Sequence, residues 1–287
     1  MATQKILVTG ANGQLGSELK DLASSYPQFE FCFTDYQELS IIDENAVNEF
    51  FKSYQPAYCI NCAAYTAVDK AEDPAEQKIV MVVNADAVGF LAKACAANGA
   101  KLVHVSTDYV FDGTATTPYK EDTPPHPVSM YGISKLKGEE LAAAHTDPVI
   151  VRTAWVYSAY GKNFVKTMMR LMSEKPAISV VGDQYGTPTY AADLAKALLD
   201  IVVSGKWAAG IYHFTDEGKI SWYDFAVSIR DILGSSCQVN AISTSDYPTA
   251  AKRPAYSVLD KTKISETYHV AIPNWLDSLK LCMSRMK

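Results

Sequence analysis

A glycine-rich turn near the start of the chain limits the possible folds more than any other stretch. It follows an apolar run at residues 5–9, contains Gly10, Gly13 and Gly16, and leads into residues 17–22, whose apolar side chains recur with helical spacing. Short apolar runs of this kind are typical of strands buried on both faces of a parallel sheet. In such a unit the glycines allow a tight turn, a close approach of backbone to a pyrophosphate, and close packing of helix on strand. The unit therefore predicts an α/β chain that binds a dinucleotide at the N-terminus of its first helix.

The rest of the first half repeats this alternation. Apolar runs lie at residues 29–33, 58–62, 101–105 and 149–152, and helical patterns lie at residues 44–54, 76–98 and 129–145. Alternating units of this kind form a parallel sheet with helices on both faces. We therefore expect an α/β fold built on a doubly wound parallel (Rossmann) sheet.

The second half is less regular. Helical patterns lie at residues 162–173, 191–203, 221–233 and near 273–286, and apolar runs lie at residues 178–181 and 210–214. We expect a dinucleotide-binding domain at residues 1–152, to which parts of 187–215 return. Residues 153–287 are expected to form mainly a smaller, interleaved substrate-binding domain.

Several small or polar residues follow directly after predicted strands, among them Gly10, Asp35, Ala63 and Thr107. Ligands of open α/β sheets bind beyond the carboxyl ends of the strands, so we expect these residues to line one site. Asp35 lies 19 residues after Gly16, where a carboxylate can bind the adenosine ribose. Such a carboxylate favours NADH, because it repels the 2′-phosphate of NADPH. A turn cap is the structural alternative for Asp35.

Tyr131 and Lys135 are four residues apart in a segment with a helical pattern. This spacing places both side chains on one face of a helix. A nearby ammonium favours the phenolate, so we expect Lys135 to lower the pKa of Tyr131. The pair is then suited to acid–base catalysis.

The composition excludes several other classes of function. The formal net charge is -6 and no basic run occurs, which argues against nucleic acid as the main partner. We see no apolar run of membrane-spanning length and no signal peptide, so we expect a cytoplasmic protein without a membrane partner. Cys59 and Cys62 lie three apart on a predicted strand and point to opposite faces, so we expect core cysteines. His104 is expected to be a satisfied residue of its strand, with no part in catalysis.

Taken in order, the glycine motif, residues 61–64, residues 106–107 and the Tyr131–Lys135 pair resemble the short-chain dehydrogenase/reductase superfamily. The form of the glycine motif and the chain length are similar to its extended branch, which acts on nucleotide sugars. Further segments resemble the dTDP-4-dehydrorhamnose reductase family. These segments are residues 63–72, 106–113, 163–168, 183–188 and 247–254.

The resemblance implies roles for individual positions. The implied catalytic residues are Tyr131, the proton donor, Lys135, which holds the nicotinamide ribose, and Thr107, which polarises the sugar carbonyl. The implied cofactor-binding residues are Gly10, Gly13, Gln14, Leu15, Gly16, Asp35, Ser40, Ile41, Ala63, Ala64, Tyr65, Tyr131 and Lys135. The implied substrate-binding residues are Thr107, Asp108, Tyr131, Trp155 and Arg253. The structural alternative for Trp155 is a place in the core. The structural alternative for Arg253 is a solvated surface position.

Two departures from the family pattern matter. Relatives usually carry an aspartate where Ser40 precedes Ile41, so adenine recognition here is expected to depend more on backbone groups. Some relatives bind Mg²⁺ through glutamates. Glu18 matches the first of these, but the second position falls at Ala192. We therefore predict no metal site.

The resemblance implies hydride transfer from NADPH, or NADH, to C4 of dTDP-4-dehydro-L-rhamnose, which gives dTDP-L-rhamnose. It also implies a homodimer. Two alternatives stay open: another nucleotide-sugar enzyme, such as an epimerase or a dehydratase, and a non-catalytic regulatory subunit with the dinucleotide fold. A dehydratase would need an acidic pair after Thr107, but Tyr109 follows Asp108.

Overall fold

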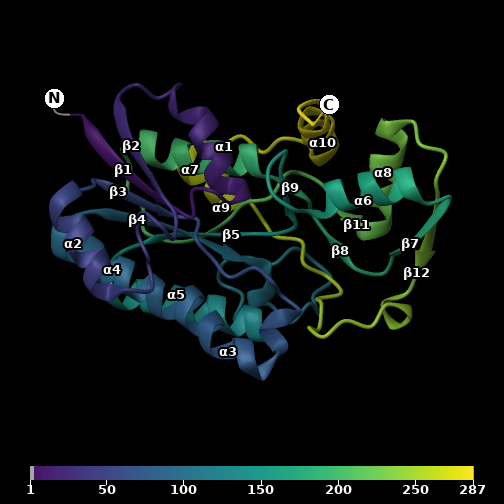
Figure 1. Cartoon of the computed structure of the whole chain (residues 1–287), viewed down its shortest axis with the longest axis horizontal. Helices are drawn as coiled ribbons and strands as arrows, with labels where there is room; N and C mark the ends of the chain where they lie inside the picture. The colour runs from purple at the N-terminus through teal and green to yellow at the C-terminus, as the bar shows by residue number, and fades with distance from the viewer. Residues whose placement is uncertain (1–2, 287) are drawn as a thin grey trace.

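The computed structural model describes residues 3–286. At its centre lies a six-stranded sheet with the order β10-β5-β4-β3-β1-β2 (Figure 1). The strands are β1 (Gln4–Thr9), β2 (Phe29–Thr34), β3 (Tyr58–Asn61), β4 (Lys101–Thr107), β5 (Val149–Thr153) and β10 (Gly210–His213). Every neighbouring pair is parallel. The predicted parallel sheet is therefore confirmed.

The strand order reverses next to β1. From β1 the chain goes outward to β2 and then returns across β1 to β3, after which β4, β5 and β10 add on the other side. This is the doubly wound arrangement in which one strand, β2, flanks β1 on its outer side. The reversal leaves a crevice beyond the carboxyl ends of β1 and β3, where ligands of such sheets bind.

Helices cover both faces of this sheet (Figure 1). On one face lie α1 (Gln14–Ala23), α7 (Ala191–Val203) and α9 (Thr262–Tyr268), which pack in one core with Val8 and Val103 of the sheet. On the other face lie α2 (Glu44–Tyr54), α4 (Ala87–Asn98) and α5 (Met130–His145), whose core includes Leu7 and Leu102. Successive residues of each strand thus point to opposite helical layers.

The expected helix over residues 76–98 is interrupted. It consists of α3 (Pro74–Met81), a π-helical turn at Val82–Asp86, and α4. The stretch Pro74–Asn98 is long and apolar enough by composition to cross a membrane, so the expectation that no run reaches that length is wrong by this measure. Of its most apolar window, 56% is buried inside the protein, as in a core helix.

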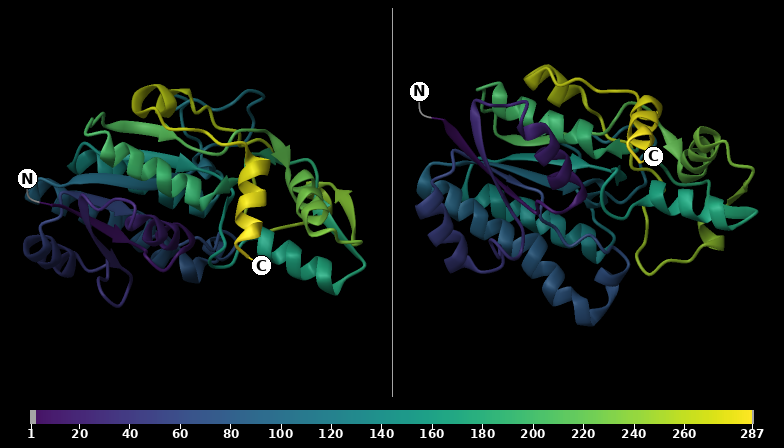
Figure 2. Two further views of the ribbon diagram at one scale, coloured as in Figure 1. Left: turned by 90° about the horizontal axis from the view of Figure 1, so that it is seen from above. Right: turned by 45° about the horizontal axis from the view of Figure 1, so that its top comes forward.

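A smaller lobe lies beside the carboxyl ends of the strands (Figure 2). It contains α6 (Phe164–Glu174), α8 (Trp222–Leu233) and α10 (Trp275–Ser284), with the parallel pair β7 (Ala177–Val181) and β12 (Gln238–Ile242). Short two-residue strands complete it: β6 (Val156–Tyr157), β8 (Tyr185–Gly186), β9 (Thr189–Tyr190) and β11 (Ile220–Ser221). The sequence patterns predict neither β12 nor α9.

The chain passes between the two parts more than once. After β6 and α6 in the lobe, α7 packs against α1, and β10 pairs with β5 in the large sheet. Ile264 of α9 then joins the core around α1, before α10 ends the fold beside α8 and β9. The expected division of the chain at residue 152 stays a prediction.

Candidate active site

The glycine turn has the geometry that the motif predicts. Gly10 has φ +66, and a Cβ there would lie 2.6 Å from the Ala63 nitrogen. A Cβ at Gly16 would lie 2.5 Å from the Ala11 Cα, so α1 packs directly against the end of β1. Gly13 is the N-cap of α1 and provides no side-chain hydrogen bond. The first N–H groups of α1 are therefore available to an anion.

A cavity of about 370 Å³ opens at this turn. Its lining is Gly10, Gly13, Asp35, Tyr36, Leu39, Ile41, Ile42, Cys62, Ala63, Ala64, Ile79 and Val83. Six of these positions belong to the predicted cofactor set. Five other lining residues belong to no sequence motif, and only folding brings them to the crevice: Tyr36, Leu39, Ile42, Ile79 and Val83.

The Asp35 carboxylate is fixed at the edge of this cavity. Its Oδ2 accepts a hydrogen bond from the Asn12 backbone N–H at 2.9 Å, and its Oδ1 accepts one from the Tyr36 backbone N–H at 2.8 Å. Both the glycine turn and the end of β2 thus hold the side chain. A fixed negative charge faces any group that occupies this end of the cavity.

Other predicted cofactor residues lie around the cavity without lining it. The Gln14 side-chain oxygen Oε1 accepts from Asn163 Nδ2 at 2.9 Å, and Leu15 is buried in the core. Ser40 precedes the lining residue Ile41. Tyr65 is held through its backbone, because Asn84 of the π-helical turn accepts from its N–H at 2.8 Å and donates to its carbonyl at 3.1 Å.

The helix α5 presents Tyr131 and Lys135 as predicted. Ser129 caps it by accepting from the Gly132 amide, and Glu72 accepts from the Met130 amide at 2.7 Å. A Cβ at Gly132 would lie 2.2 Å from the Tyr109 carbonyl oxygen, so this glycine lets α5 start close to the end of β4. Tyr131 is half-buried, and Lys135 is buried.

Burial governs the titration of this pair. It raises the pKa of Tyr131 to about 12, although the neighbouring Thr107 hydroxyl acts in the opposite direction. The expected net lowering of the Tyr131 pKa is therefore wrong in this structure, because burial outweighs any effect of Lys135. Burial also lowers the pKa of Lys135 to about 8, against the charges of Glu139 and Cys62. At neutral pH the phenol keeps its proton and the amine is mostly charged.

Thr107 and Asp108 lie buried at the end of β4. The Thr107 hydroxyl donates to Asp108 Oδ1 at 3.0 Å. Burial raises the pKa of Asp108 to about 6, although the nearby hydroxyls of Ser257 and Thr107 oppose this shift. Asp108 Oδ2 is buried and has no partner among the described residues. Sequence reasoning did not identify Ser257, which comes from a distant loop.

Trp155 packs within the smaller lobe. Its ring stacks on Trp222 with ring centroids 3.6 Å apart. A Cβ at Gly186 would lie 2.7 Å from the Trp155 ring, so the glycine makes room for the ring. Its φ of +49 is in the left-handed region, which is uncommon outside glycine. Trp222, and not Trp155, lines the 580 Å³ cavity of this lobe. A substrate contact by Trp155 stays a prediction.

Arg253 links the two parts of the molecule. Its Nη2 donates to Asp69 Oδ2 at 2.7 Å, and it lines the 580 Å³ cavity together with Phe164, Trp222 and Tyr247. The Arg253 Nη1 is buried without a partner among the described residues. An unpaired guanidinium nitrogen beside a cavity is suited to a phosphate oxygen.

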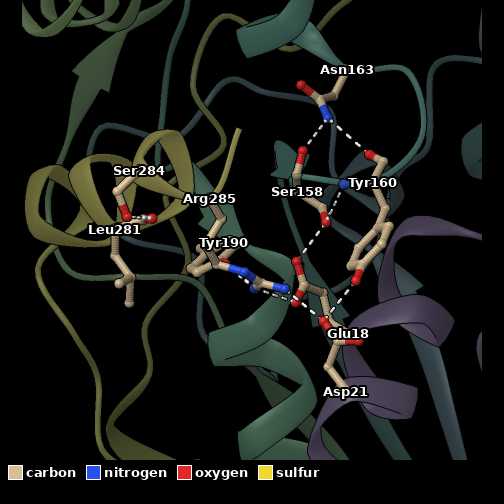
Figure 3. A network of polar contacts seen from close by, with 9 residues as sticks. All are labelled: Glu18, Asp21, Ser158, Tyr160, Asn163, Tyr190, Leu281, Ser284 and Arg285. Carbon is tan, nitrogen blue, oxygen red and sulfur yellow. Dashed lines mark hydrogen bonds and ion pairs between the residues drawn. The ribbon is translucent and has the colours of Figure 1, made fainter. Parts of the chain in front are cut away.

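Glu18 is engaged by protein groups (Figure 3). The Ser158 hydroxyl donates to its Oε1 at 2.6 Å, and Arg285 Nη1 donates to its Oε2 at 2.7 Å. Within residues 3–286, no three His, Cys, Asp or Glu side chains are grouped as a metal site would require. The Arg285 guanidinium thus contacts Glu18, the position at which some relatives bind Mg²⁺.

Comparisons with known proteins decide the family. The model of the RmlD substrate binding domain matches residues 4–287. A dTDP-4-dehydrorhamnose reductase of Aggregatibacter actinomycetemcomitans is 43% identical, over 96% of this chain and 97% of the relative. This chain belongs to the dTDP-4-dehydrorhamnose reductase family.

Solved structures of family members agree with the fold. The dTDP-4-dehydrorhamnose reductase of Clostridium acetobutylicum superposes with a TM-score of 0.93 and 42% identity, covering 98% of this chain and 99% of that one. The dTDP-4-dehydrorhamnose reductase of Bacillus anthracis, solved in complex with NADP, gives a TM-score of 0.94 and 36% identity with the same coverage. The resemblance inferred from the sequence motifs is confirmed.

Proposed function

We propose that this chain reduces the 4-keto group of dTDP-4-dehydro-L-rhamnose to give dTDP-L-rhamnose, with NADPH or NADH as the hydride donor. The observation that supports this most is that α5 holds Tyr131 and Lys135 against the end of β4, where Thr107 lies. There Lys135 donates to the Val105 carbonyl at 2.8 Å and lies near Cys62, which lines the cavity at the glycine turn. Family membership supplies the substrate class, since curated members carry the name of this reductase.

The residues present fit a dinucleotide. The uncapped N-terminus of α1 and the bare backbone at Gly13 suit the pyrophosphate, and the 370 Å³ cavity suits the adenosine half. When bound, the reduced nicotinamide would supply the hydride. Lys135 would hold the nicotinamide ribose. The NADP complex of the Bacillus anthracis relative supports NADPH.

Proton donation falls to Tyr131. Its raised pKa keeps the phenol protonated at neutral pH, which suits a group that must deliver a proton to a developing alkoxide. When substrate binds, the Thr107 hydroxyl would turn its proton from Asp108 Oδ1 to the same carbonyl oxygen and polarise it. The Lys135 ammonium would stabilise the phenolate that forms. As pH rises past the Lys135 pKa of about 8, this charge is lost, so the rate should fall on the alkaline side.

The unpaired polar atoms support a substrate site between the two parts of the molecule. Asp108 Oδ2 would accept a hydrogen bond from a sugar hydroxyl, and Arg253 Nη1 would donate to the diphosphate. The cavity lined by Phe164 and Trp222 would receive the thymine base. A cytoplasmic location and a homodimer stay predictions.

The test follows NADPH and NADH oxidation by absorbance with dTDP-4-dehydro-L-rhamnose as substrate. Tyr131→Phe should lower kcat by about 10²–10⁴. The control, Tyr223→Phe in α8, should leave it unchanged. If wild type binds the cofactor but consumes neither form, the reductase proposal fails. NAD carried through purification would then favour an epimerase, and its absence a regulatory subunit.

A further inference from the structure

Three buried polar side chains form a row beneath the catalytic lysine. Thr9 ends β1, Asn61 ends β3, and His104 lies in β4, and the strand register pairs Thr9 with Asn61 and Asn61 with His104. All three point to the face of the sheet that α5 covers, and all three are buried. The proposed mechanism assigns none of them a role.

The backbone fixes which way the Asn61 amide points. Its Oδ1 accepts from the Ala63 backbone N–H at 3.1 Å and from the Thr9 hydroxyl at 2.6 Å. A backbone N–H only donates, so the atom that faces it must be the oxygen. The Asn61 NH₂ group therefore faces His104 Nδ1, at 3.0 Å.

This contact fixes the tautomer of His104. Because an NH₂ group donates, His104 Nδ1 must accept, and the ring proton must be on Nε2. Burial lowers the pKa of His104 well below its ordinary value, and the charge of Lys135 lowers it further, so the ring is neutral.

The His104 Nε2–H group then faces the Lys135 Nζ. The separation of 3.5 Å is long, as expected for two donors, whereas the Val105 carbonyl accepts from the same Nζ at 2.8 Å. His104 thus takes no proton from the ammonium. The other groups whose charge acts on Lys135 are Glu139 on α5 and Cys62 after β3. Tyr131 lies one turn before Lys135 on α5.

We propose that Asn61 and His104 are positioning residues for Lys135. They keep the His104 Nε2–H group, a donor, beneath the Lys135 ammonium. One ammonium N–H bonds to the Val105 carbonyl, and the others find no acceptor at His104, so they are directed toward Tyr131 and the cofactor site. With the opposite tautomer, His104 Nε2 would accept one of these N–H groups and turn it away from the active site. This inference rests on the proposed reduction, in which Lys135 supports Tyr131.

Asn61→Asp tests the proposal with an almost isosteric change. A carboxylate at position 61 can only accept, so His104 must place its proton on Nδ1, and Nε2 then accepts from Lys135. We expect ¹⁵N-histidine NMR spectra to show the Nε2–H form in wild type and the Nδ1–H form in the variant. The plateau kcat should fall about tenfold, and the alkaline limb should move up by about one pH unit, because the ammonium gains an acceptor.

Two substitutions of His104 separate positioning from packing. His104→Gln keeps an acceptor for Asn61 and a donor for Lys135, so its kcat should stay within about threefold of wild type. His104→Leu fills a similar volume but removes the donor that faces Lys135, so the ammonium is no longer kept directed toward Tyr131. Its kcat should fall about tenfold, while the Kd for NADPH, measured by fluorescence, stays unchanged. Equal loss in the two variants, or no loss in the leucine variant, would overturn the proposal.

The NMR measurement does not depend on turnover. An Nδ1–H form in wild type would refute the positioning proposal even if the enzyme reduces its substrate at full rate. An Nε2–H form in a protein that consumes no cofactor would instead count against the proposed reaction.

Discussion

At the scale of single residues, Asp108 combines two roles that conflict. In the proposed reaction its Oδ2, which has no partner among the described residues, would accept from the substrate, yet the whole carboxyl is buried. Burial penalises the charged form, which is why the pKa of Asp108 is raised to about 6. The folded protein therefore binds this proton more tightly than the unfolded chain does.

Asp108→Asn should consequently change how stability depends on pH. A folded-state pKa above the unfolded value means that wild type loses stability as pH rises from about 4 to about 6. This loss reaches at most about 3 kcal/mol and persists at higher pH. The asparagine variant lacks it, so its free energy of unfolding relative to wild type should improve between pH 4 and pH 8. Urea titrations at both pH values measure the difference, and a constant difference would contradict the buried charge.

Asp35 bears on the choice between the two cofactors. Because both oxygens are held by backbone amides, the carboxylate cannot turn aside easily for a 2′-phosphate. Asp35→Asn should raise the ratio of kcat/KM for NADPH over NADH by about tenfold. Asp43→Asn, which changes only the cap of α2, is the control and should leave the ratio unaltered. An unchanged ratio in the Asp35 variant would show that the charge does not discriminate.

Residue positions set by the backbone motif were predictable from sequence, whereas contacts made across the fold were not. Asp35 follows β2 and reaches the cavity because the end of a strand determines where it lies. Tyr36 also lines the cavity, but an exposed tyrosine beside a turn carries no distinguishing signal. Trp155 matched a family position, yet its partner Trp222 comes from a helix far along the chain.

At the scale of elements, the contact between α1 and β1 is the tightest constraint on the cofactor site. Gly16→Ala would place a methyl group 2.5 Å from the Ala11 Cα and the Gly10 carbonyl oxygen, both backbone atoms. We expect a loss of about 1–3 kcal/mol in unfolding free energy from overpacking. The Kd for NADPH should rise at least tenfold, because α1 must shift.

Gly89→Ala provides the matched control for this change. Its added Cβ would meet Leu141 at an ordinary 3.4 Å inside a helix, and alanine favours helix by about 0.5–1 kcal/mol. Denaturant titration and cofactor fluorescence compare the two variants. Equal behaviour would mean that helix packing at the turn does not limit cofactor binding.

Elements with a strong local pattern were predictable, and those defined by their neighbours were not. The expected helices over residues 44–54 and 191–203 agree with α2 and α7, since their apolar faces repeat at helical spacing. The π-helical turn in the middle of the helix at 74–98 has no such signature. There Asn84 bonds to Tyr65 and Ser134, and Gly138 approaches the Asn84 carbonyl closely, so its geometry depends on α5.

At the scale of the whole molecule, Arg285 joins the last turn of the chain to its first helix (Figure 3). It contacts Glu18 and Asp21 of α1 and the Tyr190 hydroxyl. Glu18 is buried, and its two carboxylate oxygens accept from Ser158 and Arg285. This cluster ties the smaller lobe to the helix that begins at the glycine turn.

Arg285→Met should therefore lower the free energy of unfolding by at least about 2 kcal/mol, since it leaves a buried carboxylate with only the Ser158 hydroxyl. Arg170→Met removes an exposed pair with Glu174 and should cost less than about 1 kcal/mol. Thermal unfolding of both variants gives the comparison. A Tm for Arg285→Met no lower than that of the control would show that the cluster does not hold the lobes together.

The strand order has a consequence for how the protein is made. The core around α1 is closed by β10 and by Ile264 and Tyr268 of α9, residues from the last third of the chain. A ribosome therefore releases the glycine turn and its neighbouring strands long before the segments that cover them. Until then, the apolar edge of β5 and one side of α1 remain open, a state prone to wrong pairing between nascent chains. Synthesis of truncated products should yield aggregates rather than a smaller nucleotide-binding protein.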